Sequence, residues 1–228
     1  MSLSDKVALV TGATGGLGTA IAQALLHAGA RVYLTGRNDD KLNKLVQDNR
    51  EYLGSIRADL RNTRVLEKLI DEVKPDILIN CAGVFPVESI AETSEETFDE
   101  TFDINVRAPF ILTKLASKYM KQKQWGRIIN IASSSAYAGF PNTSVYCASK
   151  HALLGFSRSA YHELKNEGIR VYCFSPGSIK TDMGRLVKGQ DYNTFMEPDE
   201  IAQFIIEAIS YNGNMISEEV RLNRMFVQ

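Results

Sequence analysis

A glycine-rich turn between a short apolar run and a helical pattern constrains the fold of this chain more than any other feature. Residues 6–11 are apolar and β-branched, Gly12, Gly16 and Gly18 follow them, and a helical pattern then runs to His27. Glycines at such a junction let a phosphate approach the backbone N–H groups and the positive end of the helix. Glycine-rich turns are common in proteins that bind nothing, but in this context they predict a nucleotide site.

Strand and helix patterns alternate along the rest of the chain without a linker or a repeat. This alternation implies right-handed crossovers and a parallel sheet. We therefore predict one α/β domain over residues 1–228, with a doubly wound, seven-stranded parallel sheet and helices on both faces. The expected strands are residues 6–11, 31–35, 54–58, 76–80, 127–132, 169–174 and 219–226. The expected helices run to 27, from 39 after an Asn38 cap, over 63–73, 94–123 and 143–166, and from 198.

The balance of charges narrows the possible partners. The 26 Lys and Arg residues and the 27 Asp and Glu residues give a formal net charge of -1. This balance does not indicate binding to nucleic acid or to an anionic membrane, which a strong net positive charge would favour. No apolar run approaches the ~18 residues that a transmembrane helix needs. Three cysteines and three histidines without metal-like spacing indicate reduced thiols in a cytoplasmic protein and no metal site.

Tyr146 and Lys150 lie four residues apart in the helix expected at 143–166. The phenol and the ammonium therefore share one helix face. A fixed cation favours the phenolate, so such a tyrosine can act as a general acid or base closer to neutral pH. By itself, such a pair is more often an aromatic ring packed against the aliphatic part of a lysine whose amine reaches solvent. The glycine-rich turn and the motifs that follow favour the catalytic interpretation here.

Together these motifs resemble the short-chain dehydrogenase/reductase family. Thr11-Gly12-x-x-x-Gly16-x-Gly18 has the spacing of the ordinary single-domain branch, and the resemblance covers residues 6–183 motif by motif. It implies a Rossmann fold and carbonyl reductase activity, and the 3-oxoacyl-carrier-protein reductases are among the nearer-looking relatives. The sugar-nucleotide epimerase branch would need a larger substrate domain than 228 residues supply.

The resemblance also implies four catalytic residues. Ser133 would stabilise the alkoxide formed from a carbonyl substrate, Tyr146 would supply the proton, and Lys150 would hold the nicotinamide ribose and lower the tyrosine pKa. Asn105 would interrupt its long helix and hold a water that relays protons. Ser133 lies 13 positions ahead of the tyrosine, as the family pattern requires, and Ser134 or Ser135 remains an alternative pocket residue.

The tip of the second strand bears on cofactor choice. Gly36 stands where NAD-using relatives would carry an acid, and the Arg37 guanidinium suits a 2′-phosphate, so NADP(H) is expected rather than NAD(H). The alternatives are a solvated Arg37 and a ribose acid at Asp39 or Asp40, which we interpret as first-turn helix residues. By resemblance, the cofactor-binding residues are Gly12, Thr14, Gly16, Leu17, Gly18, Arg37, Asp59, Leu60, Asn80, Ala82, Gly83, Tyr146, Lys150, Pro176, Gly177, Ile179 and Thr181.

Several of these assignments have a plainer alternative. Asp59 could cap a helix, Pro176-Gly177 could be a generic turn, and Cys147 is interpreted as a structural thiol. Cys81 replaces the second asparagine usual in the family, which affects local hydrogen bonding only. Residues 182–197 could form a substrate lid or simply pack on the surface.

The sequence therefore predicts an NADP(H)-dependent oxidoreductase that acts on a small-molecule carbonyl or secondary alcohol, with 3-oxoacyl thioesters among the candidates. The competing hypothesis is a non-catalytic NADP(H) sensor or scaffold on the same fold. The family resemblance implies a homodimer or homotetramer formed through the helices that begin near residues 94 and 143.

Overall fold

The computed structural model describes residues 3–225, and its strands and helices alternate along most of the chain. The strands are β1 (Val7–Thr11), β2 (Arg31–Gly36), β3 (Gly54–Arg57), β4 (Ile77–Asn80), β5 (Gly126–Ile131), β6 (Ile169–Pro176) and β7 (Glu219–Leu222). The helices are α1 (Gly16–His27), α2 (Asp39–Asp48), α3 (Thr63–Val73), α4 (Glu95–Phe102), α5 (Ala108–Lys123), α6 (Ser144–Leu164) and α7 (Pro198–Ser210).

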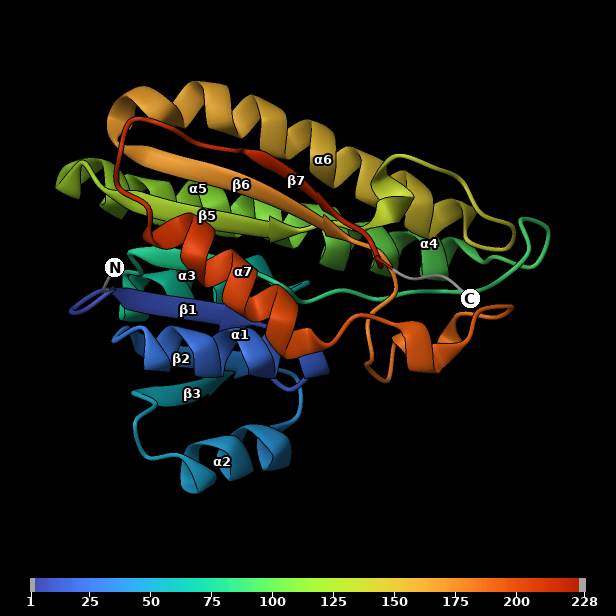
Figure 1. Cartoon of the computed structure of the whole chain (residues 1–228), viewed down its shortest axis with the longest axis horizontal. Helices are drawn as coiled ribbons and strands as arrows, with labels where there is room; N and C mark the ends of the chain where they lie inside the picture. The colour runs from blue at the N-terminus through green and yellow to red at the C-terminus, as the bar shows by residue number, and fades with distance from the viewer. Residues whose placement is uncertain (1–2, 226–228) are drawn as a thin grey trace.

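All seven strands form one parallel sheet in the order β3-β2-β1-β4-β5-β6-β7 (Figure 1). The predicted fold class is therefore confirmed. The chain winds outward from β1 to β3 and then returns to place β4 on the other side of β1. Ligands of such sheets bind outside the carboxyl ends of the strands where the winding reverses, which here is between β1 and β4.

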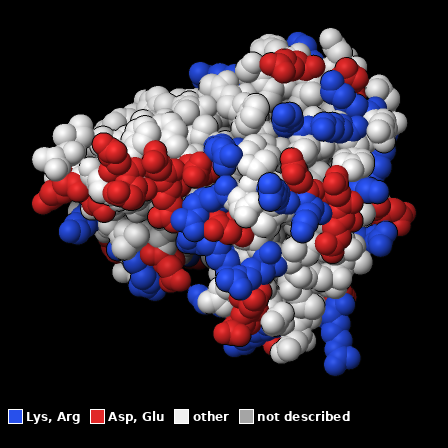
Figure 2. Space-filling model, turned by 180° about the vertical axis from the view of Figure 1, so that it is seen from behind, with Lys and Arg blue, Asp and Glu red and all other residues white. Residues whose placement is uncertain are grey.

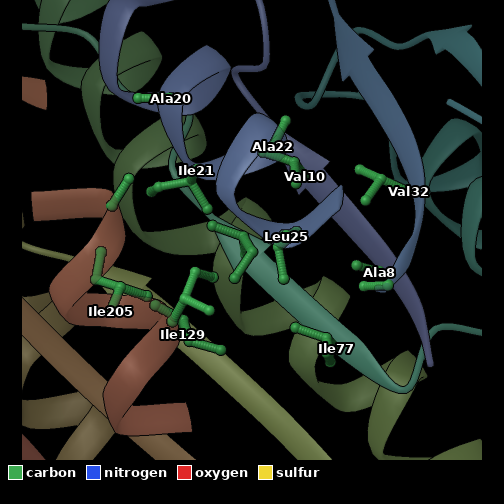
Figure 3. Close-up of a cluster of buried hydrophobic side chains, with 14 of the residues drawn as sticks. Ala8, Val10, Ala20, Ile21, Ala22, Leu25, Val32, Ile77, Ile129 and Ile205 are labelled. Carbon is green, nitrogen blue, oxygen red and sulfur yellow. The ribbon is translucent and has the colours of Figure 1, made fainter. Parts of the chain in front are cut away.

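The central strands are buried on both faces, so their alternate residues supply two separate cores. On β1, Ala8 and Val10 join the core that contains α1 and α7, whereas Leu9 joins the core on the opposite face. Figure 3 shows the first core, in which Ile21 and Leu25 of α1 lie with Val10 and other strand residues. α3, α5 and part of α6 cover the other face. This two-sided burial explains why the strands read as continuous apolar runs.

Asparagine caps fix the starts of two helices at the edge of the sheet. The Asn38 side chain accepts a hydrogen bond from the Lys41 backbone N–H at 2.9 Å, which confirms the expected cap of α2. Asp39 and Asp40 then occupy the first turn of that helix, where negative charge complements the dipole. Asn62 caps α3 in the same way, so the proposed helix-capping alternative for Asp59 is wrong for that helix.

The helix expected over residues 94–123 is divided in the structure. α4 and α5 are joined by a wider π-helical turn, Asp103–Arg107, which contains the buried Asn105. Turns of this kind often mark functional sites. The predicted interruption of the long helix at Asn105 is therefore confirmed.

Other differences lie at the ends of elements and after β6. α6 continues into a short 3-10 turn, Lys165–Glu167, and the segment 182–197 contains two further 3-10 turns, Gly184–Leu186 and Tyr192–Thr194. The last strand is observed over Glu219–Leu222, whereas the expectation extended to Phe226, which lies outside the described residues.

The surface carries charges of both signs. In the face shown in Figure 2, Lys and Arg side chains are interleaved with Asp and Glu side chains over much of the area. Within residues 3–225, no helix has the length and apolar character required to cross a membrane.

Candidate active site

The glycine-rich loop between β1 and α1 is tightly packed against the segment that follows β4. Gly12 has a φ of +67°, and a Cβ at this position would lie 2.7 Å from the Ala82 Cα. A Cβ on Gly18 would lie 2.2 Å from the carbonyl oxygen of Gly12. Because glycine has no side chain, the loop can pack this closely and still leave the first turn of α1 open to a dinucleotide pyrophosphate.

Thr11 fixes this loop to its neighbour. Its hydroxyl accepts hydrogen bonds from the backbone N–H groups of Cys81 and Ala82, both at 3.1 Å, and donates to the Ile79 carbonyl at 3.2 Å. Thr11 was not among the predicted site residues. Its signal in the sequence was its place at the end of β1, directly before the first glycine.

The glycine-rich loop opens into a cavity of about 770 Å³ that runs along the carboxyl edge of the sheet. Its lining includes nearly all the residues predicted to form the site. These are Gly12, Thr14, Gly16, Leu17, Gly18, Arg37, Asp59, Leu60, Ala82, Gly83, Ser133, Tyr146, Lys150, Pro176, Gly177, Ile179 and Thr181. The structure thus brings together segments that lie far apart in the chain, from Gly12 to Thr181. A cavity of this size and lining suits a nicotinamide dinucleotide.

Two predicted residues, Asn80 and Asn105, lie beneath the cavity rather than in its lining. The Asn80 amide donates to the Asn130 side chain at 2.8 Å, and Asn130 in turn donates to the Ser157 hydroxyl at 2.9 Å. This buried network joins β4, β5 and α6. Asn80 therefore supports the floor of the site instead of facing a ligand.

At the end of the cavity beside β2 and β3, the charged lining residues are Arg37, Lys41 and Asp59, and two of them have ion-pair partners. The Arg37 guanidinium lies 3.3 Å from a Glu100 carboxylate oxygen. Arg61 donates to the Asp59 carboxylate from Nε at 3.0 Å and from Nη2 at 2.7 Å. This contact lowers the pKa of Asp59 to about 2. Lys41 also lines the cavity, and no carboxylate in residues 3–225 pairs with it. Sequence analysis missed Lys41, although it follows Arg37 by four positions.

At the other end of the cavity, α6 brings Tyr146 and Lys150 up to the residues that follow β5. The Ser133 side chain lies near enough to the Tyr146 phenol to lower its pKa, and the Phe85 ring meets the Tyr146 ring edge-on with ring centres 4.6 Å apart. The Lys150 ammonium donates to the Ile131 carbonyl at 2.9 Å and lies 5.6 Å from the centre of the tyrosine ring. A hydroxyl, a phenol and an amine thus line the same end of the cavity, an arrangement that can transfer a proton to a bound ligand.

Burial dominates the acid–base properties of this group. It raises the pKa of Tyr146 to about 12, although the nearby Ser133 side chain acts in the opposite direction. Burial also lowers the pKa of Lys150 to about 8. The pKa of Tyr146 is therefore raised rather than lowered as expected, because desolvation of the phenolate is the largest cause of the shift. Tyr146 is a fully protonated acid at neutral pH.

Asn105 is held on three sides by protein atoms. Its Oδ1 accepts from the Val84 N–H at 2.9 Å, and its Nδ2 donates to the Val84 carbonyl and to the Ser149 hydroxyl, each at 3.0 Å. Ser149 donates to the Tyr146 carbonyl at 2.7 Å. Both amide hydrogens are used, so a relay water could reach Asn105 only as a donor. Ser149 was overlooked, although it directly precedes Lys150.

The remaining predictions concern residues near this group. Ser134 and Ser135 both line the cavity, which leaves them as pocket residues beside Ser133. Cys147 is buried behind the cavity lining, with its sulfur 3.3 Å from the hydroxyl of the lining residue Thr143, and does not itself line the cavity. This position agrees with a structural thiol. Among residues 3–225, His, Cys, Asp and Glu side chains do not gather in groups of three or more that could hold a metal ion.

The chain matches known proteins over most of its length. The family model of the short chain dehydrogenases matches residues 6–191. The 3-oxoacyl-[acyl-carrier-protein] reductase FabG of Rickettsia prowazekii (strain Madrid E) is 34% identical over 227 residues, which cover 95% of this chain and 94% of that protein.

Two solved structures that resemble this chain hold different cofactors. One, described as an NAD(P)-dependent gluconate 5-dehydrogenase from Beutenbergia cavernae with NADP at low occupancy, has a TM-score of 0.87 and 26% identity over 97% of this chain and 96% of its own. The other, a 4-hydroxyisoleucine dehydrogenase with NADH, has a TM-score of 0.85 and 26% identity over 96% of this chain and 98% of its own.

Proposed function

The chain is an oxidoreductase that belongs to the short-chain dehydrogenase family, and on that premise we propose that it is an NADP(H)-dependent carbonyl reductase. It transfers a hydride reversibly between the cofactor and a ketone, an aldehyde or a secondary alcohol. One observation carries this proposal: a single cavity joins the glycine-rich loop and Arg37 to the side chains of Ser133, Tyr146 and Lys150.

Each catalytic side chain has a role that follows from its position. The bound cofactor supplies the hydride and accepts it in the reverse direction. The Ser133 hydroxyl donates a hydrogen bond to the carbonyl oxygen and stabilises its negative charge. The Tyr146 phenol, whose pKa of about 12 keeps it protonated, gives its proton to that oxygen. The Lys150 ammonium then stabilises the phenolate that remains.

The pKa of Lys150, about 8, gives carbonyl reduction a pH dependence. Below this pH the side chain is a cation and stabilises the phenolate; above it the side chain is neutral. Tyr146 stays protonated throughout the range, because its pKa is near 12. We expect kcat/KM for reduction to be level below pH 8 and to fall about tenfold per pH unit above it. A profile measured from pH 6 to 10 that stays level to pH 10 would exclude a role for the lysine charge.

The preference for NADP(H) is supported by the adenosine end of the cavity. Arg37 and Lys41 both line it, and Gly36 provides no acidic side chain that would repel a 2′-phosphate. Glu100 is the partner of Arg37 here, and its single contact leaves most donors of the guanidinium fork free for phosphate oxygens.

Arg37→Ala is expected to weaken NADPH binding roughly tenfold and NADH binding less than about twofold, because a 2′-phosphate occurs only in NADPH. Fluorescence titration of the purified protein with each cofactor measures both constants. Arg57→Ala is the matched control, since Arg57 is an exposed arginine of the same region, pairs with Asp39 at 3.6 Å and is absent from the cavity lining. If Arg37→Ala weakened the binding of NADPH and NADH by the same factor, Arg37 would not contact the 2′-phosphate.

For the substrate we propose a carbonyl carried on an apolar chain, such as a 3-oxoacyl thioester. The outer part of the cavity is lined by Val87, Phe140, Met183 and Leu186, which are all large apolar side chains exposed by 37% to 52%. Exposed apolar side chains that gather around a cavity indicate an apolar ligand. The named activity of the reductase from Rickettsia prowazekii supports the same class. A panel of ketones and aldehydes of increasing chain length, set against polyol substrates, tests it.

We also propose a homo-oligomer in a reducing, cytoplasmic compartment. Phe98 of α4 and Phe110 of α5 are 45% and 49% exposed, which supports an interface on these helices. The three cysteines are free thiols, as expected in a reducing compartment. Sedimentation of the purified protein tests the assembly.

A further inference from the structure

Arg224 joins the carboxyl-terminal end of the described chain to the segment that follows β6. Its guanidinium donates to the Thr194 hydroxyl at 2.7 Å and to the Gln190 side-chain oxygen at 2.9 Å. It also lies 5.3 Å from the centre of the Phe195 ring, which is buried. One half-buried side chain thus makes three contacts within six consecutive residues, 190–195.

The segment held by Arg224 is part of the cavity wall. Leu186, Val187, Lys188 and Gln190 line the outer, substrate end of the cavity. In Figure 1 this orange segment lies beyond the carboxyl ends of the strands, between β6 and α7. Its position over the outer end of the cavity makes it able to restrict access to Tyr146.

The base of the segment is fixed separately from its outer part. The Lys180 N–H donates to the Met196 carbonyl at 2.9 Å, and the Met196 N–H donates to the Ser178 carbonyl at 3.0 Å. Lys180 also forms an ion pair with Glu197. These contacts hold the loop that carries Ile179 and Thr181 without help from Arg224.

Apart from the packing of Phe195, the outer part has few other side-chain hydrogen bonds to the rest of the described chain. The Ser178 hydroxyl donates to the same Gln190 oxygen at 2.8 Å. Most of the remaining hydrogen bonds and ring contacts of residues 186–195 stay within the segment, such as the turn bonds of Asp191 and the contact between the Tyr192 and Phe195 rings. Apart from the packing of the buried Phe195, Arg224 therefore supplies two of the three side-chain hydrogen bonds within residues 3–225 that join residues 186–195 to segments outside 178–197 or to Ser178.

We propose that Arg224 is a positioning residue that clasps residues 186–195 over the outer end of the cavity and thereby sets the affinity for the carbonyl substrate. This inference rests on the proposed function, since it names the residue that shapes the substrate end of that same site. Loss of the clasp opens the outer wall and leaves the cofactor loop in place. Substrate affinity is then expected to fall while cofactor affinity and the chemical step persist.

Hydrogen exchange tests the clasp without any substrate. In Arg224→Ala, amides of residues 186–195 are expected to exchange roughly tenfold faster than in the wild type, the change expected for the loss of a charge-assisted hydrogen bond. Amides of α7, residues 201–209, are expected to keep the wild-type rate, which shows that the fold is intact. Arg221→Ala is the matched control, because Arg221 is an exposed arginine of β7 that lies over the Tyr137 ring at 4.2 Å.

Kinetics test the consequence for the substrate. Arg224→Ala is expected to raise KM for the carbonyl compound roughly tenfold, with kcat and the Kd of NADPH within about twofold of the wild type. Arg224→Lys restores part of the affinity, because an amine can reach one acceptor but cannot span both as a guanidinium does. In a Thr194→Val background, Arg224→Ala is expected to raise KM by a smaller factor than it does in the wild type, since the two residues share a hydrogen bond.

The outcomes separate this inference from the proposed function. If residues 186–195 exchange no faster in Arg224→Ala than in Arg221→Ala, the clasp does not exist. If exchange rises but KM is unchanged, the clasp does not control the substrate, and the inference is overturned on that point. A wild-type protein that reduces no carbonyl compound would instead refute the proposed function, while the exchange result would still decide the clasp.

Discussion

Replacing Tyr146 by phenylalanine is expected to lower kcat for carbonyl reduction by roughly 10²- to 10⁴-fold, the range that a general acid contributes. The phenol is the group placed to give a proton to the carbonyl oxygen, and its pKa of about 12 keeps that proton available at neutral pH. The phenylalanine ring retains the edge contact with Phe85, so the cavity keeps its shape. The Kd of NADPH is therefore expected to stay within about twofold of the wild-type value.

The control for this prediction is Tyr137→Phe. Tyr137 is a nearby tyrosine whose hydroxyl donates to Glu219 at 2.7 Å, and it is absent from the cavity lining. The Tyr137→Phe substitution removes this hydrogen bond and leaves the Tyr146 phenol in place as the proton donor. Steady-state rates measured on the same carbonyl compound compare the two variants. If Tyr146→Phe retained wild-type turnover, another group would have to be the acid.

Gly18→Ala is expected to produce the second large effect, a loss of NADPH affinity of roughly 10- to 100-fold. A Cβ at this position would lie 2.2 Å from the Gly12 oxygen and 2.8 Å from the Gly12 carbonyl carbon, which are backbone atoms. The glycine-rich loop must move to accept it. Overpacking of this kind costs about 1–3 kcal/mol, and the displaced backbone N–H groups no longer converge on the pyrophosphate.

Gly155→Ala is the matched glycine substitution. Gly155 lies on an exposed turn of α6, and a Cβ there would have no neighbour within 4 Å. We expect this variant to bind NADPH as the wild type does and to gain about 0.5–1 kcal/mol in free energy of unfolding, because alanine favours a helix over glycine. Titration with NADPH and denaturant unfolding compare both variants. Unchanged NADPH affinity in Gly18→Ala would contradict the pyrophosphate assignment of this loop.

The features predicted from the sequence are those that neighbouring residues determine. The turn from Thr11 to Gly18 lies within one junction, and the cap at Asn38 involves a contact three residues away. The apolar runs of β1 and β4 reflect burial on both faces, which a single strand reveals in its own composition. Asn105 was recognisable because asparagine is unfavourable inside a helix, and the structure has a π-helical turn there.

The features that the sequence did not predict depend on contacts between distant segments. The pKa of Tyr146 depends on how completely the rest of the fold buries it, which no local pattern records. Asn80 was expected in the cofactor site, but its partner Asn130 lies 50 positions away and holds it below the cavity. Arg224 contacts residues 30 and 34 positions away, in a region where the family resemblance had thinned.

The measurement that tests the central claim most directly uses NADPH labelled with deuterium at the transferable position of the nicotinamide. The protein is incubated with this cofactor and a 3-oxoacyl thioester or another ketone of an apolar chain, and the product is analysed by mass spectrometry. We expect a hydroxyl product with one deuterium on the former carbonyl carbon, formed by the wild type and at greatly reduced rate by Tyr146→Phe. If NADPH binds tightly but no compound of the panel acquires the label, the chain is a cofactor sensor on this fold and not a carbonyl reductase.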